Sequence, residues 1–174
     1  DYNDSKRDDL FAATPPLEAL KILLSLYMTE GIGWTLNKKR RMKMDFIDVR
    51  RAYFHAEAIR DVFIELPDEL SEPGMCGKLF KSMYGTRDAA QNWEKAYNDF
   101  MIDSGFKAGI SGPCLFYHKN RNLRAVIHGD DFTTAGAKSD LDWFEKEMQK
   151  HYECTIQPRI GPGPADSKEG LVLN

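Results

Sequence analysis

The chain has 174 residues, 42% of them hydrophobic and 11% aromatic, which is enough to build the core of one domain. No apolar run approaches the roughly 18–20 residues that a membrane-spanning helix needs, and the first residues lack the layout of a secretory signal. We therefore expect an intracellular protein without a membrane partner. With 24 basic and 27 acidic residues the net charge is −3, so any polyanion site must be local. The three widely spaced cysteines predict neither a disulfide framework nor a metal knuckle.

The first half of the chain predicts one helix and then strands. The helix begins near Thr14, which can cap it, and the prolines at 15 and 16 suit its first turn. Apolar residues recur at helical spacing until Gly31 ends the run; they are Leu17, Leu20, Leu24 and Tyr27. A buried strand and two shorter strand candidates follow, at 42–49, 62–66 and 76–80.

The second half predicts two further helices around a hairpin. The helix at 87–104 carries one apolar stripe, formed by Ala89, Trp93, Tyr97, Phe100 and Met101, and Gly105 follows it. A hairpin is expected at 114–127, with a polar tip at 119–122, and the last helix is capped by Ser139 and buries Leu141, Phe144, Met148 and Tyr152. Together these elements predict an α+β fold with helices packed on one face of an antiparallel sheet.

The most informative segment is the pair Asp130 and Asp131, which follows Gly129 between two apolar, strand-like runs. Two interpretations fit it: an ordinary solvated hairpin tip, or a site for a hard cation such as Mg²⁺. The cation site needs a third carboxylate, and Asp48 at the end of the strand at 42–49 supplies it. Asp45 lies three residues earlier, so it points to the opposite face and is expected to be structural.

Other kinds of site fit the sequence less well. The four histidines have no zinc-ligand spacing, and neither a phosphate-binding glycine loop nor a hydrolase nucleophile elbow occurs. One dense basic run, Lys38, Lys39, Arg40, Arg41 and Lys43, is interpreted either as a solvated turn or as a phosphate-facing or nuclear-targeting patch.

Five segments together resemble the reverse transcriptase of copia-type retrotransposons. They are 8–12, 48–53, 81–85 with Trp93, 105–106 with 113–116, and 128–131. The resemblance implies a polymerase-palm-like fold over 1–157, with partial fingers, followed by an irregular Pro/Gly-rich tail over 158–174 that leads towards a missing thumb. It further implies an element protein in cytoplasmic particles or the nucleus.

The resemblance also implies roles for individual residues. Asp48, Asp130 and Asp131 would be the catalytic acids and the ligands of Mg²⁺, with Mn²⁺ as a substitute. Tyr53 would exclude the ribose 2′-hydroxyl. Gly85, Lys81 and Arg87 would contact the incoming dNTP or the template, and the basic run would contact the RNA or DNA template-primer. The reaction would be two-metal transfer of a deoxynucleotide to a primer 3′-hydroxyl.

The sequence departs from the family pattern at two places, and two alternatives stay open. His128 and Gly129 replace a tyrosine and an apolar residue, and Asp88 stands where a neutral amide is usual. These changes keep open an inactive or repurposed remnant that binds nucleic acid or protein. Gly129-Asp130-Asp131 is also the signature of RNA-dependent RNA polymerases, although the bulky ring of Tyr53 opposes that alternative.

Overall fold

A computed structural model describes residues 12, 14–29 and 41–170. The chain divides into two compact units. The sheet unit contains 13–50 and 98–174, and the insert unit contains 51–97 together with 1–12. Among the described residues, no helix has both the length and the apolar character that a membrane crossing requires.

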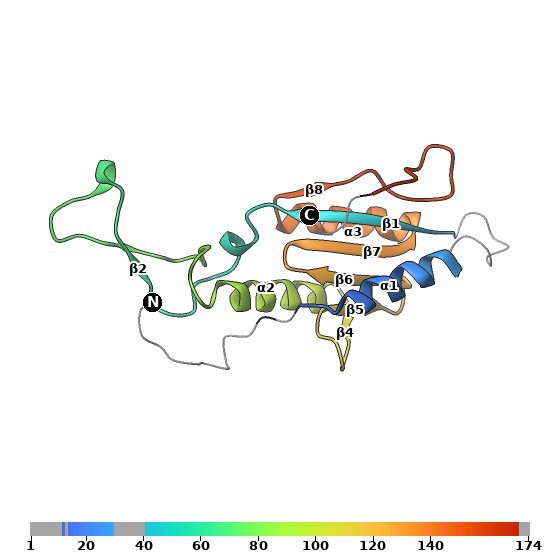
Figure 1. Ribbon diagram of the computed structural model, residues 1–174, viewed down its shortest axis with the longest axis horizontal. Coiled ribbons are helices and arrows are strands. Elements are labelled where there is room, and N and C mark those ends of the chain that lie inside the picture. Colours follow the sequence, from blue (N-terminus) through green and yellow to red (C-terminus); the bar gives the residue numbers. More distant parts are fainter. Residues whose placement is uncertain (1–11, 13, 30–40, 171–174) are drawn as a thin grey trace. The chain divides into compact units, whose positions relative to one another are not determined.

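The sheet unit is built on six antiparallel strands in the order β4-β5-β6-β7-β1-β8 (Figure 1). The strands are β1 (Met42–Val49), β4 (Lys107–Ala108), β5 (Leu115–His118), β6 (Leu123–His128), β7 (Asp131–Ala137) and β8 (Cys154–Ile156). Strands β5, β6 and β7 follow one another as a meander, and β1 pairs with the far side of β7. The predicted antiparallel α+β fold is confirmed.

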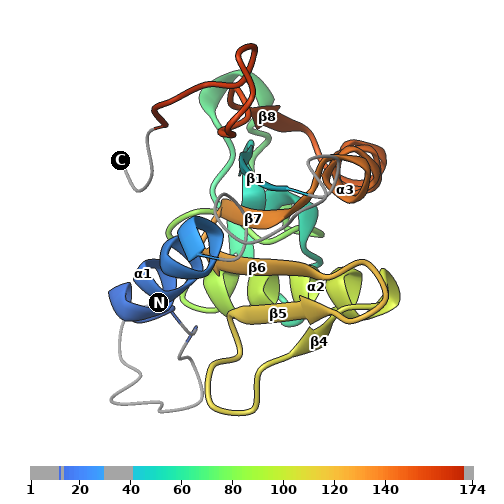
Figure 2. The same ribbon diagram turned by 90° about the vertical axis from the view of Figure 1, so that its right-hand side faces the viewer.

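Helices lie on both faces of this sheet, not on one face as the sequence predicts (Figure 2). On one face, α1 (Leu17–Leu26) places Leu23 in a buried cluster with Met44 and Phe46 of β1. On the other, α3 (Lys138–His151) packs against β1 and β7 and buries Leu141, Phe144 and Met148. The third helix, α2 (Ala89–Asp103), runs from the insert unit into the sheet unit, where its Phe100 contacts Phe144.

Several predicted elements are confirmed, and three details are wrong. The strand β1 and the hairpin of β5 and β6 lie where expected, and the whole predicted stripe of α2 is buried. However, the residue before α1 is Pro16 without a side-chain cap, and Ser139 lies inside α3 rather than at its cap. In α1 the buried residues are Ala19 and Leu23, whereas Leu17 and Leu24 are exposed. The apolar side of this helix is wide, with Glu18, Lys21 and Ser25 on the remaining side, so periodicity alone does not select which part of the apolar side is buried.

The insert unit has little regular structure. It contains a two-stranded sheet, β2 (Phe63–Ile64) with β3 (Gly77–Lys78), and two 3₁₀ turns, Ala52–His55 and Asp68–Leu70. Both strands are shorter than the sequence predicts. Their side chains are exposed or half-buried, so no buried face exists that would extend the pairing. The cysteines Cys76, Cys114 and Cys154 are free thiols, and only Cys114 is buried.

A buried ion-pair network joins β1 to the C-terminal segment and to α3. Asp45 is only 1% exposed and accepts two hydrogen bonds from Arg159, at 2.5 and 2.8 Å. Arg159 also pairs with Asp142 and Glu145 of α3, at 2.6 and 2.8 Å. Burial raises the pKa of Asp45 to about 6, although Arg159 acts in the opposite direction. The predicted structural role of Asp45 is therefore confirmed, and its counter-ion lies 114 residues away.

The segment after β8 continues along the edge of β1 and is hydrogen-bonded to it. Ile160 exchanges two backbone hydrogen bonds with Met44, at 2.9 and 3.0 Å, and Lys43 donates to Asp166 at 2.5 Å. The Lys168 ammonium donates to the carbonyls of Gly161 and Gly163. The Pro/Gly-rich segment is thus irregular in secondary structure but bonded to the sheet; the predicted domain boundary at 157 stays a prediction.

We expect Arg159→Met to lower the free energy of unfolding by about 3–5 kcal/mol at pH 8, because it leaves the buried Asp45 carboxylate without a counter-ion. The loss should shrink towards pH 5, since a carboxyl whose pKa is raised by burial becomes protonated there at less cost. Urea unfolding across this pH range measures both effects.

The matched control is Lys150→Met, which breaks the exposed pair of Lys150 with Glu147. It should cost less than about 1 kcal/mol and show no comparable pH dependence. Equal losses in the two variants would show that the Arg159 network does not stabilise the fold.

Candidate active site

Two of the predicted catalytic acids face each other across neighbouring strands. The register of β1 against β7 pairs Asp48 with Asp131, at the end of a ladder that begins with Met42 and Ala137. Side chains alternate between the two faces of a strand, so Met44, Phe46 and Asp48 lie on the same face of β1. Met44 and Phe46 are buried against α1, and Asp48 therefore lies on the α1 face at the end of the strand. The site therefore lies at one end of the sheet, wholly within the sheet unit.

The third acid lies in the turn between β6 and β7. Gly129 has φ +63°, a left-handed conformation that glycine adopts without strain, and Asp130 follows it. The backbone N–H of Val49 donates to the carbonyl of Asp130 at 3.0 Å. This bond fixes the turn against the end of β1, next to Asp48. The structure thus brings together the three acids that the sequence selected from distant segments.

The electrostatics of these acids follow from their proximity and partial burial. Burial first, and then the Asp130 charge, raise the pKa of Asp48, while Arg50 lowers it. Burial, followed by the charges of Asp130 and Asp48, likewise raises the pKa of Asp131, and His128 opposes this. His128 is the β6 partner of Asp131, so the residue that replaces the family tyrosine sits beside a predicted catalytic acid.

The donor chemistry of the site suits a hard divalent cation, because neighbouring negative charges raise the pKa of Asp48 and of Asp131, and a positive charge between the carboxylates would relieve that repulsion. As placed, the side chains of 12, 14–29 and 41–170 form no group of three or more His, Cys, Asp or Glu residues that could hold a metal ion. The backbone arrangement therefore fits the ion, and the complete ligand set stays a prediction.

The predicted substrate-contacting residues lie in the insert unit. Tyr53, in the turn Ala52–His55, stacks on Tyr84 with ring centroids 4.4 Å apart, and Phe54 meets Tyr84 edge-on at 5.7 Å. Gly85 has φ +90° and open space where a Cβ would stand. Lys81 is paired with Glu57 at 2.5 Å, and Arg87 is exposed.

The basic run is only partly described. Lys38, Lys39 and Arg40 lie outside the described residues. Arg41 is half-buried just before β1, and Lys43 is paired with Asp166. A phosphate at Lys43 would therefore compete with an existing ion pair.

The structure adds Arg60, a residue that the sequence did not single out. It pairs at 3.0 Å with the buried Asp88, the acid that stands in place of a neutral amide. The other Asp88 oxygen accepts from the Asn92 amide at 3.3 Å, and that amide also donates to Ser82. The extra charge is thus balanced locally. No sequence signal identified Arg60, since the segment around it has no regular pattern.

The antiparallel sheet, the hairpin turn with its acid pair and the third acid on the adjoining strand define a polymerase-palm-like α+β domain. The chain belongs to the family described as reverse transcriptase (RNA-dependent DNA polymerase), whose model matches residues 3–158. This confirms the resemblance to copia-type retrotransposon reverse transcriptases.

Curated relatives agree with this family. The chain is 22% identical over 140 residues to the retrovirus-related Pol polyprotein from transposon TNT 1-94 of Nicotiana tabacum, a match that covers 77% of the chain and 10% of that protein. It is 25% identical over 126 residues to the transposon Ty1-NL2 Gag-Pol polyprotein of Saccharomyces cerevisiae (70% and 7% covered). The chain thus spans a tenth or less of these relatives. No solved structure matches it.

We expect Asp131→Asn to stabilise the cation-free protein at pH 7.5, because an acid with a raised pKa destabilises the fold once pH exceeds that pKa. A rise of roughly 2–4 °C in Tm corresponds to about 1 kcal/mol in a domain of this size. The gain should shrink towards about pH 4, where the native carboxyl is increasingly protonated. Thermal unfolding in EDTA at several pH values tests this.

Asp103→Asn is the matched control, because Asp103 is an exposed acid at the end of α2. It should change stability by no more than about 0.5 kcal/mol. A destabilised Asp131→Asn variant would contradict the mutual repulsion inferred for the site.

Proposed function

We propose that this chain carries the catalytic palm of an RNA-directed DNA polymerase and that Asp48, Asp130 and Asp131 are its catalytic acids. The observation that supports the proposal most directly is the pairing of Asp48 with Asp131 in the β1–β7 register, beside the turn that carries Asp130. Family membership supplies the reaction class. The activity of the whole polyproteins is not carried over, because the chain spans only a small part of them.

In the proposed reaction the primer 3′-oxygen forms a bond to the α-phosphorus of a dNTP. The bond from that phosphorus to the bridging oxygen breaks, pyrophosphate leaves, and the hydroxyl proton is released. Mg²⁺, or Mn²⁺ in its place, would neutralise the negative charge that gathers around the phosphorus. Asp48, Asp130 and Asp131 would hold the cation, and their mutual repulsion would favour its binding.

Four of the residues proposed to contact substrate, Tyr53, Lys81, Gly85 and Arg87, belong to the insert unit. Tyr53 would exclude a ribose 2′-hydroxyl, and its stacking on Tyr84 limits how far the ring can turn. Gly85 would allow close approach of a base or template strand, because nothing fills the space beside its Cα. Lys81, Arg87 and the basic run at 38–43 would meet phosphates of the dNTP or the template-primer. The site of action would be intracellular, in cytoplasmic particles or the nucleus.

The central test is primer extension by the full chain on poly(rA)·oligo(dT) with dTTP and Mg²⁺ or Mn²⁺. Asp48→Asn and Asp130→Asn should each lower the rate by at least about 100-fold, the scale of losing an electrostatic contribution to the transition state. Asp103→Asn should leave it unchanged. More than a tenth of the wild-type rate in Asp130→Asn would contradict the assignment.

Sugar selection tests the role of Tyr53. Tyr53→Ala should raise incorporation of UTP relative to dTTP, because it removes the ring that would collide with the 2′-hydroxyl. Phe54→Ala is the control, since Phe54 is the adjacent ring and also contacts Tyr84. If Tyr53→Ala leaves the ratio of UTP to dTTP incorporation unchanged, or if both variants change it equally, Tyr53 does not select the sugar.

A second candidate function is a non-catalytic remnant that binds nucleic acid or protein. It is favoured by one observation: the described side chains, as placed, gather no three-ligand metal group. If the wild-type chain shows neither primer extension nor an Mg²⁺-dependent rise in Tm, this second function replaces the first. The family match gives no support to an RNA-synthesising polymerase.

A further inference from the structure

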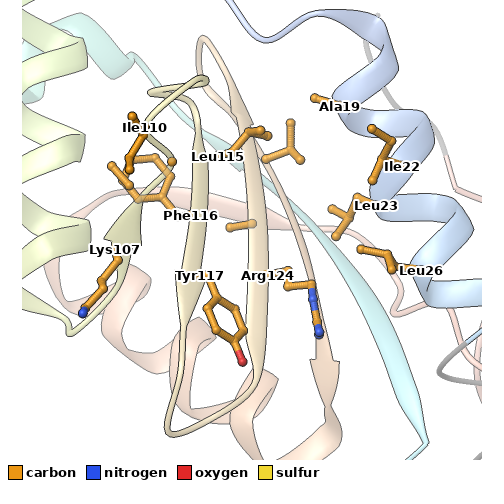
Figure 3. A pocket seen from close by; sticks show the side chains of 14 residues that line it. Ala19, Ile22, Leu23, Leu26, Lys107, Ile110, Leu115, Phe116, Tyr117 and Arg124 are labelled. Carbon is orange, nitrogen blue, oxygen red and sulfur yellow. The ribbon is translucent and has the colours of Figure 1, made fainter.

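An apolar groove lies between α1 and the β4–β6 side of the sheet (Figure 3). Its volume is about 480 Å³, and all of its lining residues belong to the sheet unit. Ile22, Leu23 and Leu26 form the wall on α1, and Leu115 and Ile110 lie across from them on the sheet side. We refer to it as the α1–sheet groove; it contains none of the predicted catalytic acids, so it stands independently of the proposed function.

The groove exists because α1 has more apolar side chains than the sheet covers. Only Ala19 and Leu23 of this helix are buried, and Ile22 on the groove side is 60% exposed. On the opposite rim, Ile110 is fully exposed. Apolar surface gathered around a groove is typical of a binding site.

The charged residues of the groove are gathered in one row. Lys107 is the cross-strand partner of Tyr117, and Tyr117 is the partner of Arg124, so the three side chains stand on one face of β4, β5 and β6. They lie together at one end of the groove (Figure 3). The Arg124 guanidinium carbon lies 5.4 Å from the centre of the Tyr117 ring. Both charged residues among the described lining residues are cations, so this end favours carboxylates.

We propose that the α1–sheet groove binds an amphipathic helix of a partner protein whose apolar stripe ends in acidic side chains. The apolar residues of such a helix would fill the space beside Ile22 and Leu115. Its carboxylates would meet Lys107 and Arg124, which fixes the direction in which it lies. Buried apolar area supplies the affinity, and the charges supply the selectivity.

Two other occupants fit the geometry less well. An added β-strand would have to pair with β4, the sheet edge on this side, and β4 is only two residues long. It therefore offers too few backbone groups for strand addition. A small ligand is usually enclosed over most of its surface, whereas Ile22 and Ile110 in the lining of this groove are exposed. A helix covers both rims.

The probe is a fluorescein-labelled helical peptide of about 18 residues, with leucines at i, i+3, i+4, i+7 and i+11 and two glutamates at one end of that stripe. A second peptide has lysines in place of the two glutamates. Fluorescence anisotropy with the full chain should give at least about tenfold tighter binding of the glutamate peptide. The difference should decrease at high salt.

Two variants test the residues. Ile22→Asp should weaken binding of the glutamate peptide at least about tenfold. Met28→Asp, the matched control at nearly equal exposure (59% against 60%), lies outside the groove and should change the affinity less than twofold. The double variant Lys107→Glu/Arg124→Glu should prefer the lysine peptide. Circular dichroism and Tm establish that each variant is folded.

Three results would overturn the proposal. The first is no binding of the glutamate peptide up to about 100 μM, which corresponds to a free energy weaker than about −5.5 kcal/mol. The second is equal binding of the two peptides, or equal loss in Ile22→Asp and Met28→Asp, which would indicate non-specific adhesion. The third is a dimer in sedimentation velocity that Ile22→Asp converts to monomer, because the occupant would then be a second copy of this chain.

Discussion

The register of β1 against β7 is the constraint on which the candidate site depends. Seven residue pairs run from Met42 opposite Ala137 to Asp48 opposite Asp131. Because side chains alternate along a strand, burial of Met44 and Phe46 under α1 also decides the face on which Asp48 emerges. A slip of one residue would place Asp48 on the α3 face and bring Asp45 out of its ion pair. Hydrophobic burial thus fixes the position of a charged site that is itself unfavourable.

Two acids of the same strand show how differently one fold can treat a carboxylate. Asp45 is buried, and Arg159 surrounds it with hydrogen bonds, so its charge is compensated within the protein. Asp48, three residues later, is flanked by other acids, and burial and Asp130 together raise its pKa. In the first arrangement a neighbouring guanidinium balances the charge of a carboxylate whose pKa burial raises to about 6, while the second leaves negative charge for a cation to neutralise. The proposed function depends on the second arrangement, in which the negative charges of Asp48 and its neighbouring acids favour the binding of a cation.

The sequence predicts the strands and the acids of this chain better than its long-range partners. The apolar run of β1, the hairpin of β5 and β6 and the apolar stripe of α2 are local patterns, and each is found in the structure. Asp48 is grouped with the turn at Asp130 because a cation site needs a third carboxylate and through the family likeness, since strand pairing between distant segments leaves no local signal. For the same reason neither Arg159 nor Arg60 could be recognised as a counter-ion. The roles of Tyr53 and of the basic run stay predictions.

Helix α1 is the case in which a local pattern predicts the buried side only in part, since Tyr27 of the predicted set is buried whereas Leu17 and Leu24 are exposed. Its apolar side is wide, and the sheet covers only part of it. One flank borders the α1–sheet groove, and the other borders a smaller cavity of about 150 Å³ whose lining includes Leu20, His128 and Asp131. Residues of α1 line both the groove and the smaller cavity, so this helix is shared by the groove and the acid site. A partner bound in the groove would therefore contact the helix that borders Asp131.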